Sequence, residues 1–282
     1  MQITRQLFIS TFALALLGLV PFEVIADDYL ERVAAEHSDD SPSGNVTAAA
    51  GKVRTERRDY ATIDGERISG YLARPRSGSR PFPAVILIHE WWGLNDNIRA
   101  MARRFANAGY VALAVDLYEG EWAQDPERAR ELMQTAMNRE SRLERNLEQA
   151  YHYLDLMPST GRVGVVGWCF GGGWSLRTAL SFPRELDASV IYYGELITEA
   201  EQLEPLQVPL LGHFGSEDEV VPPESVQAFE ATLSELDKTY EIHSYEGAGH
   251  AFANPSGERY DEAAASRAWQ RTLDFLARHL RE

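Results

Sequence analysis

The chain has 282 residues, of which 44% are hydrophobic, so its composition is typical of a globular domain and argues against wholesale disorder. The formal net charge is −16, and repulsion therefore argues against binding to nucleic acids or to anionic membrane surfaces. A single cysteine excludes both an intrachain disulfide scaffold and a paired-cysteine redox or zinc motif.

Residues 1–26 have the pattern of a secretory signal peptide. Arg5 supplies a positive start, and residues 7–20 form an apolar stretch shorter than the ~20 residues that span a bilayer comfortably. Val-Ile-Ala at 24–26 precedes two aspartates, where a signal peptidase would cut. We expect export to the periplasm or beyond, with no stable membrane association after cleavage. An uncleaved anchor is the alternative.

Residues 27–55 are polar and include an Asp-Asp-Ser-Pro-Ser-Gly run at 39–44. This composition predicts a flexible linker or a loosely packed arm. Residues 56–282 are then expected to form one domain. Residues 57–75 alternate around an Asp-Gly pair at 64–65, which favours a β-hairpin.

Buried strands and helices are predicted to alternate through the rest of the domain. Continuous apolar runs indicate strands buried on both faces, and amphipathic stretches between them indicate helices. The expected strands lie at 84–89, 110–118, 162–167, 188–193, 208–214 and 240–245, and the expected helices at 96–108, 125–137, 141–156, 174–180, 222–236 and 261–280. This order predicts an α/β fold with a mostly parallel sheet and helices on both faces.

The sequence Gly-Trp-Cys-Phe-Gly at 167–171 joins an apolar run to a helix-like segment. This is the strand–turn–helix context of a nucleophile elbow. Glycines are expected at both ends of the motif because side chains there would collide within the sharp turn. The N-terminus of the following helix favours a thiolate. We therefore predict that Cys169 is a nucleophile rather than a small buried apolar residue.

Two candidate partners of the thiol follow later predicted strands, at the sheet edge where ligands bind in such folds. Asp218 follows the strand at 208–214, and His250 lies in a glycine-rich loop after the strand at 240–245. The order Cys, Asp, His is that of α/β-hydrolases. We expect His250 to exchange protons with Cys169, and Asp218, rather than the neighbouring glutamates, to fix the imidazole tautomer.

The backbone N–H groups of two residues are expected to form an oxyanion hole. One belongs to Phe170, which follows the nucleophile, and the other to Trp91, which follows the predicted strand at 84–89. Both positions are typical of this class of elbow.

Four segments together resemble the dienelactone hydrolase (carboxymethylenebutenolidase) family. They read His-Glu-Trp-Trp-Gly-Leu-Asn at 89–95, Gly-Trp-Cys-Phe-Gly-Gly at 167–172, Gly-Ser-Glu-Asp at 215–218 and Gly-Ala-Gly-His-Ala-Phe at 247–252. The resemblance covers roughly residues 60–280. It implies an α/β-hydrolase fold and a triad of Cys169, His250 and Asp218.

The resemblance also implies a glutamate, here Glu90, that contacts the resting thiol and takes its proton when substrate binds. A desolvated carboxyl has a raised pKa and can act as such a base. The alternative is a structural carboxylate paired with an arginine.

The family binds a substrate carboxylate with two arginines, and this chain departs from that pattern. One arginine falls near Arg130, with Arg128 as a rival, whereas Asn254 occupies the position four residues after the histidine. A neutral amide cannot form a charge-assisted bidentate pair. Three tryptophans are candidates for an apolar substrate pocket or for plain core, namely Trp91, Trp92 and Trp122.

These patterns predict an exported hydrolase that cleaves a small-molecule ester or lactone with a cysteine nucleophile, without a metal or an organic cofactor. One alternative is a general carboxylesterase or thioesterase with little dienelactone activity. Another is a non-catalytic binding module on the same fold.

Overall fold

A computed structural model describes residues 22–38, 40 and 53–281, and side chains from residue 28 onward. The described residues form one eight-stranded sheet in the order β1-β2-β4-β3-β5-β6-β7-β8. The strands are β1 Val53–Ile63, β2 Glu66–Pro75, β3 Phe82–Ile88, β4 Val111–Ala114, β5 Thr160–Trp168, β6 Ala188–Tyr192, β7 Leu210–Gly215 and β8 Tyr240–Tyr245. Only the pairs β1–β2 and β2–β4 are antiparallel, so the predicted, mostly parallel sheet is confirmed.

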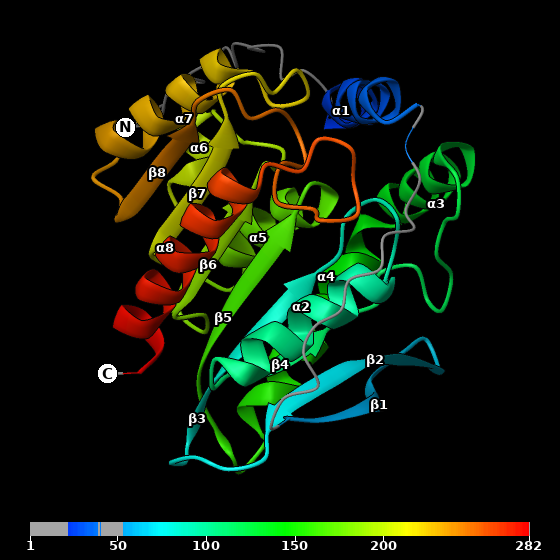
Figure 1. The fold of residues 1–282 in the computed structure, drawn as a ribbon, viewed down its shortest axis with the longest axis vertical. Coiled ribbons are helices and arrows are strands. Elements are labelled where there is room, and N and C mark those ends of the chain that lie inside the picture. The colour runs from blue at the N-terminus through cyan, green and yellow to red at the C-terminus, as the bar shows by residue number, and fades with distance from the viewer. Residues whose placement is uncertain (1–21, 39, 41–52, 282) are drawn as a thin grey trace, which may run out of the picture.

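Helices cover both faces of this sheet, as predicted. α2 and α8 pack on one face, and α4 and α5 on the other (Figure 1). The helices are α1 Phe22–Glu36, α2 Asp96–Asn107, α3 Pro126–Met137, α4 Glu140–Asp155, α5 Phe170–Ser181, α6 Ala200–Leu203, α7 Pro223–Glu235 and α8 Glu262–Leu280. The core strand β3 is almost entirely buried between the layers, which explains its continuous apolar run.

The structure confirms one predicted turn and shows a second turn that the sequence did not predict. The predicted hairpin is confirmed, and its turn residues Asp64 and Gly65 both have positive φ, as a tight two-residue hairpin turn requires. The strand predicted at 110–118 is too long, because β4 ends at Ala114. Shortly after it, the Asp116 carboxylate accepts hydrogen bonds from the backbone N–H groups of Tyr118 and Gly120, which turns the chain.

The prediction of a loosely packed arm is wrong for residues 28–38. Here α1 places Tyr29, Leu30 and Val33 on one buried face, and His37 directly follows the helix. This spacing is that of an amphipathic helix, and burial of its apolar face stabilises it. α1 lies at the end of the sheet toward which the arrows of β5 and β7 point (Figure 1). We call residues 28–38 and 40 the N-terminal arm.

Most of the predicted signal segment and part of the linker lie outside the described residues, at positions 1–21, 39 and 41–52. The cleavage expected after Ala26 therefore stays a prediction, and α1 runs across that position. Within the described part of the chain, no helix is both long and apolar enough to cross a membrane.

Candidate active site

Cys169 lies in a sharp turn between β5 and α5. Its backbone angles are φ 53° and ψ −120°, a conformation that is strained for any residue with a side chain. Its N–H donates to the Tyr192 carbonyl at 3.0 Å, and its own carbonyl accepts from the Gly172 N–H at 2.8 Å. The thiol is thereby fixed at the N-terminus of α5, where the helix dipole favours a thiolate.

The glycines on either side are required by close backbone contacts. A Cβ on Gly167 would lie 1.8 Å from the Gly171 carbonyl oxygen, and a Cβ on Gly171 would lie 2.3 Å from the Ile88 carbonyl oxygen. Neither position accepts a side chain without displacement of the main chain. The steric reason predicted for the motif is therefore confirmed.

The loops after β7 and β8 bring Asp218 and His250 to the same place. His250 Nδ1 lies 2.9 Å and 3.1 Å from the two carboxylate oxygens of Asp218. Asp218 Oδ1 also accepts from the backbone N–H groups of Val220 and Val221, which fix the carboxylate. Asp218 is buried, whereas the glutamates on either side of it are exposed. The structure thus selects the same acid that the sequence favoured.

The N-terminal arm adds a histidine that sequence reasoning missed. One ring nitrogen of His37, one of His250 and Sγ of Cys169 all lie within 4.8 Å of one another. Tyr29 from the arm also directs its hydroxyl toward Sγ, at 3.9 Å. As a result Cys169 is only 1% exposed. The available signal was the apolar spacing around Tyr29 and Val33 within an otherwise polar segment.

The charges in this cluster favour an ion pair of thiolate and imidazolium. Burial raises the pKa of Cys169, but the imidazoles of His250 and His37 outweigh burial and lower this pKa to about 6. Burial lowers the pKa of His250, but the charges of Asp218 and Cys169 outweigh it and raise this pKa to about 10. The thiolate form of Cys169 is therefore favoured in the resting protein.

Glu90, at the end of β3, is buried beside the thiol. Burial, assisted by the charge of Cys169, raises its pKa to about 7. Its carboxylate accepts from Asn254 Nδ2 at 2.7 Å and from the Tyr193 hydroxyl at 3.4 Å, and not from an arginine. Asn254, which was predicted to bind substrate, donates this hydrogen bond to Glu90. The Asn254 side-chain oxygen in turn accepts from Asn97 Nδ2 at 3.1 Å.

The other residues predicted to contact substrate, Arg130 and the three tryptophans, do not line one common pocket formed by described residues. Arg130 is exposed on α3 and forms an ion pair with Glu31 of the N-terminal arm. Trp91 and Trp92 are buried and pack against each other with ring centroids 4.9 Å apart. Trp122 is 45% exposed on the surface. The burial of Trp91 and Trp92 fits the alternative of plain core, and pocket lining by Trp122 stays a prediction.

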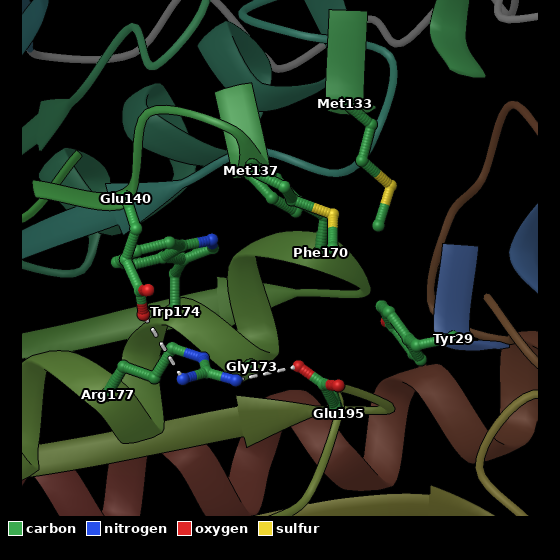
Figure 2. A pocket seen from close by; sticks show the side chains of 9 residues that line it. All are labelled: Tyr29, Met133, Met137, Glu140, Phe170, Gly173, Trp174, Arg177 and Glu195. Atoms are coloured by element: carbon green, nitrogen blue, oxygen red, sulfur yellow. Dashed lines mark hydrogen bonds and ion pairs between the residues drawn. The ribbon is translucent and has the colours of Figure 1, made fainter. Parts of the chain in front are cut away.

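A different small pocket is lined by residues of α1, α3 and α5. Its apolar wall comes from Met133 and Met137 of α3 and from Phe170 and Trp174 of α5, with Tyr29 closing one side (Figure 2). At its other end the guanidinium of Arg177 lies between two carboxylates, 3.5 Å from Glu140 and 3.1 Å from Glu195 (Figure 2). The Tyr29 side chain lines this pocket and also contacts the thiol of Cys169, which is not itself a lining residue.

Comparison with known proteins places this geometry in a family. The sequence profile described as "Dienelactone hydrolase family" matches residues 68–280. A protein of Saccharolobus solfataricus named "Putative carboxymethylenebutenolidase" is 31% identical over 262 residues, covering 79% of this chain and 98% of its own length. "Protein usf" of Aquifex pyrophilus is 34% identical over 224 residues, covering 77% and 96%.

The chain belongs to the dienelactone hydrolase family. The crystal structure of a dienelactone hydrolase-like promiscuous phosphotriesterase from metagenomic libraries superposes with a TM-score of 0.73 at 26% identity, covering 81% of this chain and 99% of its own. The predicted family and the predicted α/β-hydrolase fold are confirmed. Membership supports hydrolysis of a small-molecule substrate. The N-terminal arm lies outside the matched residues.

The first prediction concerns the pH dependence of alkylation of the Cys169 thiol. A chelator is present so that no metal ion from the solution masks the thiol. An ordinary thiol reacts roughly tenfold faster per pH unit below its pKa, because only the thiolate reacts. With the Cys169 pKa lowered to about 6, the iodoacetamide rate should be nearly constant between pH 7 and 9 and should fall below pH 6. A rate that still climbs steeply between pH 7 and 9, measured by mass spectrometry, would contradict this electrostatic account.

The second prediction concerns the support of Glu90 by Asn254. Asn254→Ala removes the shortest hydrogen bond to a buried carboxyl and should lower the free energy of unfolding by about 1–3 kcal/mol in urea titrations. Asn107→Ala, at an exposed asparagine at the end of α2, is the matched control and should change it by less than about 0.5 kcal/mol. Equal effects of the two substitutions would show that the Glu90 contact contributes no stability.

Proposed function

We propose that the protein is an exported hydrolase of carboxylic esters or lactones with Cys169 as the nucleophile. One observation carries the proposal. A thiol in a strained turn at a helix N-terminus is close to an imidazole whose Nδ1 is bound to the Asp218 carboxylate. Export rests on the signal-like pattern of residues 1–26.

In the acylation half of the reaction, Cys169 Sγ attacks the substrate carbonyl carbon and the carbonyl oxygen becomes an oxyanion. The backbone N–H groups of Phe170 and Trp91 are the proposed donors to that oxyanion. Phe170 is the first residue of α5, and the first N–H groups of a helix have no intrahelical acceptor. His250 then gives its proton to the leaving alkoxide oxygen, and a thioester with Cys169 remains.

In the deacylation half, His250 takes a proton from water and the resulting hydroxide attacks the thioester carbonyl. Collapse of the second oxyanion releases the carboxylic acid and restores the thiolate, with the proton on His250. Asp218 holds the tautomer of His250 throughout and stabilises its cation. Glu90 is the proposed acceptor of any proton left on the thiol, since burial places its pKa near neutrality.

The existing partners of the polar side chains favour an uncharged substrate over an anionic lactone. Asn254 is bonded to Glu90, Arg130 is paired with Glu31, and Arg177 is paired with two glutamates. The small pocket lined by Tyr29, Met133 and Phe170 has an apolar wall. A general carboxylesterase or thioesterase is therefore the second candidate, alongside the lactone hydrolysis that the name of the Saccharolobus relative suggests.

The third prediction tests the nucleophile. Cys169→Ala should lower kcat for activated aryl esters about 10³-fold or more, because the covalent route is lost. His250→Gln and Asp218→Asn should also lower kcat, whereas His152→Ala, at an exposed histidine on α4, should leave it unchanged. Full turnover by Cys169→Ala would rule the mechanism out. Binding without turnover by the wild type would favour a non-catalytic module.

The fourth prediction separates the two substrate classes. The wild type should hydrolyse an uncharged aryl ester with a kcat/KM at least about tenfold above that for a carboxylate-bearing dienelactone, since no described arginine near the thiol lacks an acidic partner. The same comparison at raised salt controls for repulsion by the net negative charge. A preference for the dienelactone would overturn this assignment and leave the thiol mechanism intact.

A further inference from the structure

A second histidine–aspartate pair faces the nucleophile from the N-terminal arm. His37 Nδ1 lies 2.5 Å from Asp40 Oδ2, just as His250 Nδ1 lies 2.9 Å from Asp218 Oδ2. Both histidines are at least nine-tenths buried. The proposed hydrolysis moves protons through His250 alone, so the second pair favours the thiolate but transfers no proton in that reaction.

In both rings the other nitrogen is Nε2, and a metal ion that binds there displaces any proton that it carries. Nε2 of His37 and Nε2 of His250 are buried and make no hydrogen bond to any other described residue. A buried polar atom without a partner is costly unless something else satisfies it. The two rings lie with centroids 5.5 Å apart, and the only other potential ligand within this group is the thiol of Cys169.

The chemistry of these three groups is that of a metal site. Two imidazoles and a thiolate bind zinc and similar borderline or soft ions, whereas magnesium and calcium prefer oxygen ligands. Metal-binding histidines almost always donate the other ring N–H to a carboxylate, which orients the ring and raises its basicity. Nδ1 of His37 and Nδ1 of His250 each contact such a carboxylate, and Arg259 contacts both Asp40 and His37 Nδ1.

We propose that His37, Cys169 and His250 bind a divalent transition-metal ion of the Zn²⁺ type, and that this ion fastens the N-terminal arm over the nucleophile. Zinc–ligand distances of about 2.0–2.3 Å in a tetrahedron separate ligand atoms by roughly 3.3–3.6 Å. The three atoms here already lie within 4.8 Å of one another. A small shift of His37 closes the remaining gap, since it follows the last residue of α1.

The proposed metal site depends on the arm, which lies outside the residues that the family profile matches. His37 and Asp40 precede residues 68–280, which the family profile matches. The arm is held in place by contacts that do not involve the thiol, namely the ion pairs of Glu31 with Arg130 and of Asp40 with Arg259, and the hydrogen bond of Arg259 to the Glu36 carbonyl. These contacts position His37 before any ion binds.

The ion would act as a reversible block on hydrolysis. It shares Cys169 and His250 with the proposed mechanism, so a thiolate bound to the metal cannot attack a carbonyl and a metal-bound imidazole cannot move a proton. This consequence rests on the proposed function, whereas metal binding itself does not. Chelation should restore turnover, and it should also let thiol reagents reach Cys169.

Direct binding tests the site without any measurement of turnover. Chelator-treated protein is titrated with Co²⁺, whose thiolate complexes absorb in the near ultraviolet, and with Zn²⁺ in a calorimeter. We expect one ion per chain with the thiolate band, and no binding of Mg²⁺. Cys169→Ser should abolish the band, and His37→Ala and His37→Gln should weaken Zn²⁺ binding about 100-fold or more. Asp40→Asn should weaken it about 10–100-fold.

His152→Ala is the matched control, at an exposed histidine, and should bind as tightly as the wild type. Circular dichroism checks that each variant is folded. Absence of the thiolate band, or Zn²⁺ binding by folded His37→Gln as tight as that of the wild type, would overturn the proposal. If instead the ion binds as described and the chelated protein hydrolyses no ester, the proposed function fails and the metal site stands.

Discussion

The backbone turn at Cys169 is the constraint on which the rest of the structure depends. A residue with a side chain is held at φ 53°, a conformation that costs of order 1–3 kcal/mol. It persists because the flanking strand and helix over-determine it, through the hydrogen bond to the Tyr192 carbonyl and the first turn of α5. Glycine at 167 and 171 makes the close approach of these elements possible. The parallel sheet then brings Glu90, Asp218 and His250 to the same edge, and the N-terminal arm adds Tyr29 and His37.

Burial gives the site its electrostatics. Excluded from water, the thiol and the His250 imidazole gain more from each other and from Asp218 than they lose by desolvation, so charge is retained on both. Among the described residues, no cationic side chain is hydrogen-bonded to Glu90, and the same burial raises its pKa toward neutrality. Three groups in one small volume therefore take different protonation states. The N-terminal arm maintains this difference because it covers the thiol.

Local sequence signals carried much of this information. The elbow, Asp218 and His250 could be predicted because glycines, strand ends and chain order specify them almost without tertiary knowledge. The length of β4 could not, since a side-chain contact of Asp116 with the main chain follows its end. Asn254 and Arg130 were assigned to substrate, but their acceptors, Glu90 and Glu31, are distant in sequence and become neighbours only on folding.

The arm shows most clearly where sequence reasoning stops. Its polar composition is that of a linker, yet Tyr29, Leu30 and Val33 share one face and find a matching surface over the elbow. Nothing in the segment itself identifies that surface. His37 was one of seven histidines in the sequence, and its place beside Cys169 depends on where α1 packs. The family match thus contains the elbow, Asp218 and His250, and a segment outside that match contacts the thiol.

The most direct measurement of the central claim is to trap the acyl intermediate. The protein is mixed with a slowly deacylating activated ester and quenched in acid, and its peptides are analysed by mass spectrometry. The account predicts one acyl group on the peptide containing Cys169, and none after Cys169→Ala. An acyl group on any other residue, with turnover retained in Cys169→Ala, would contradict it.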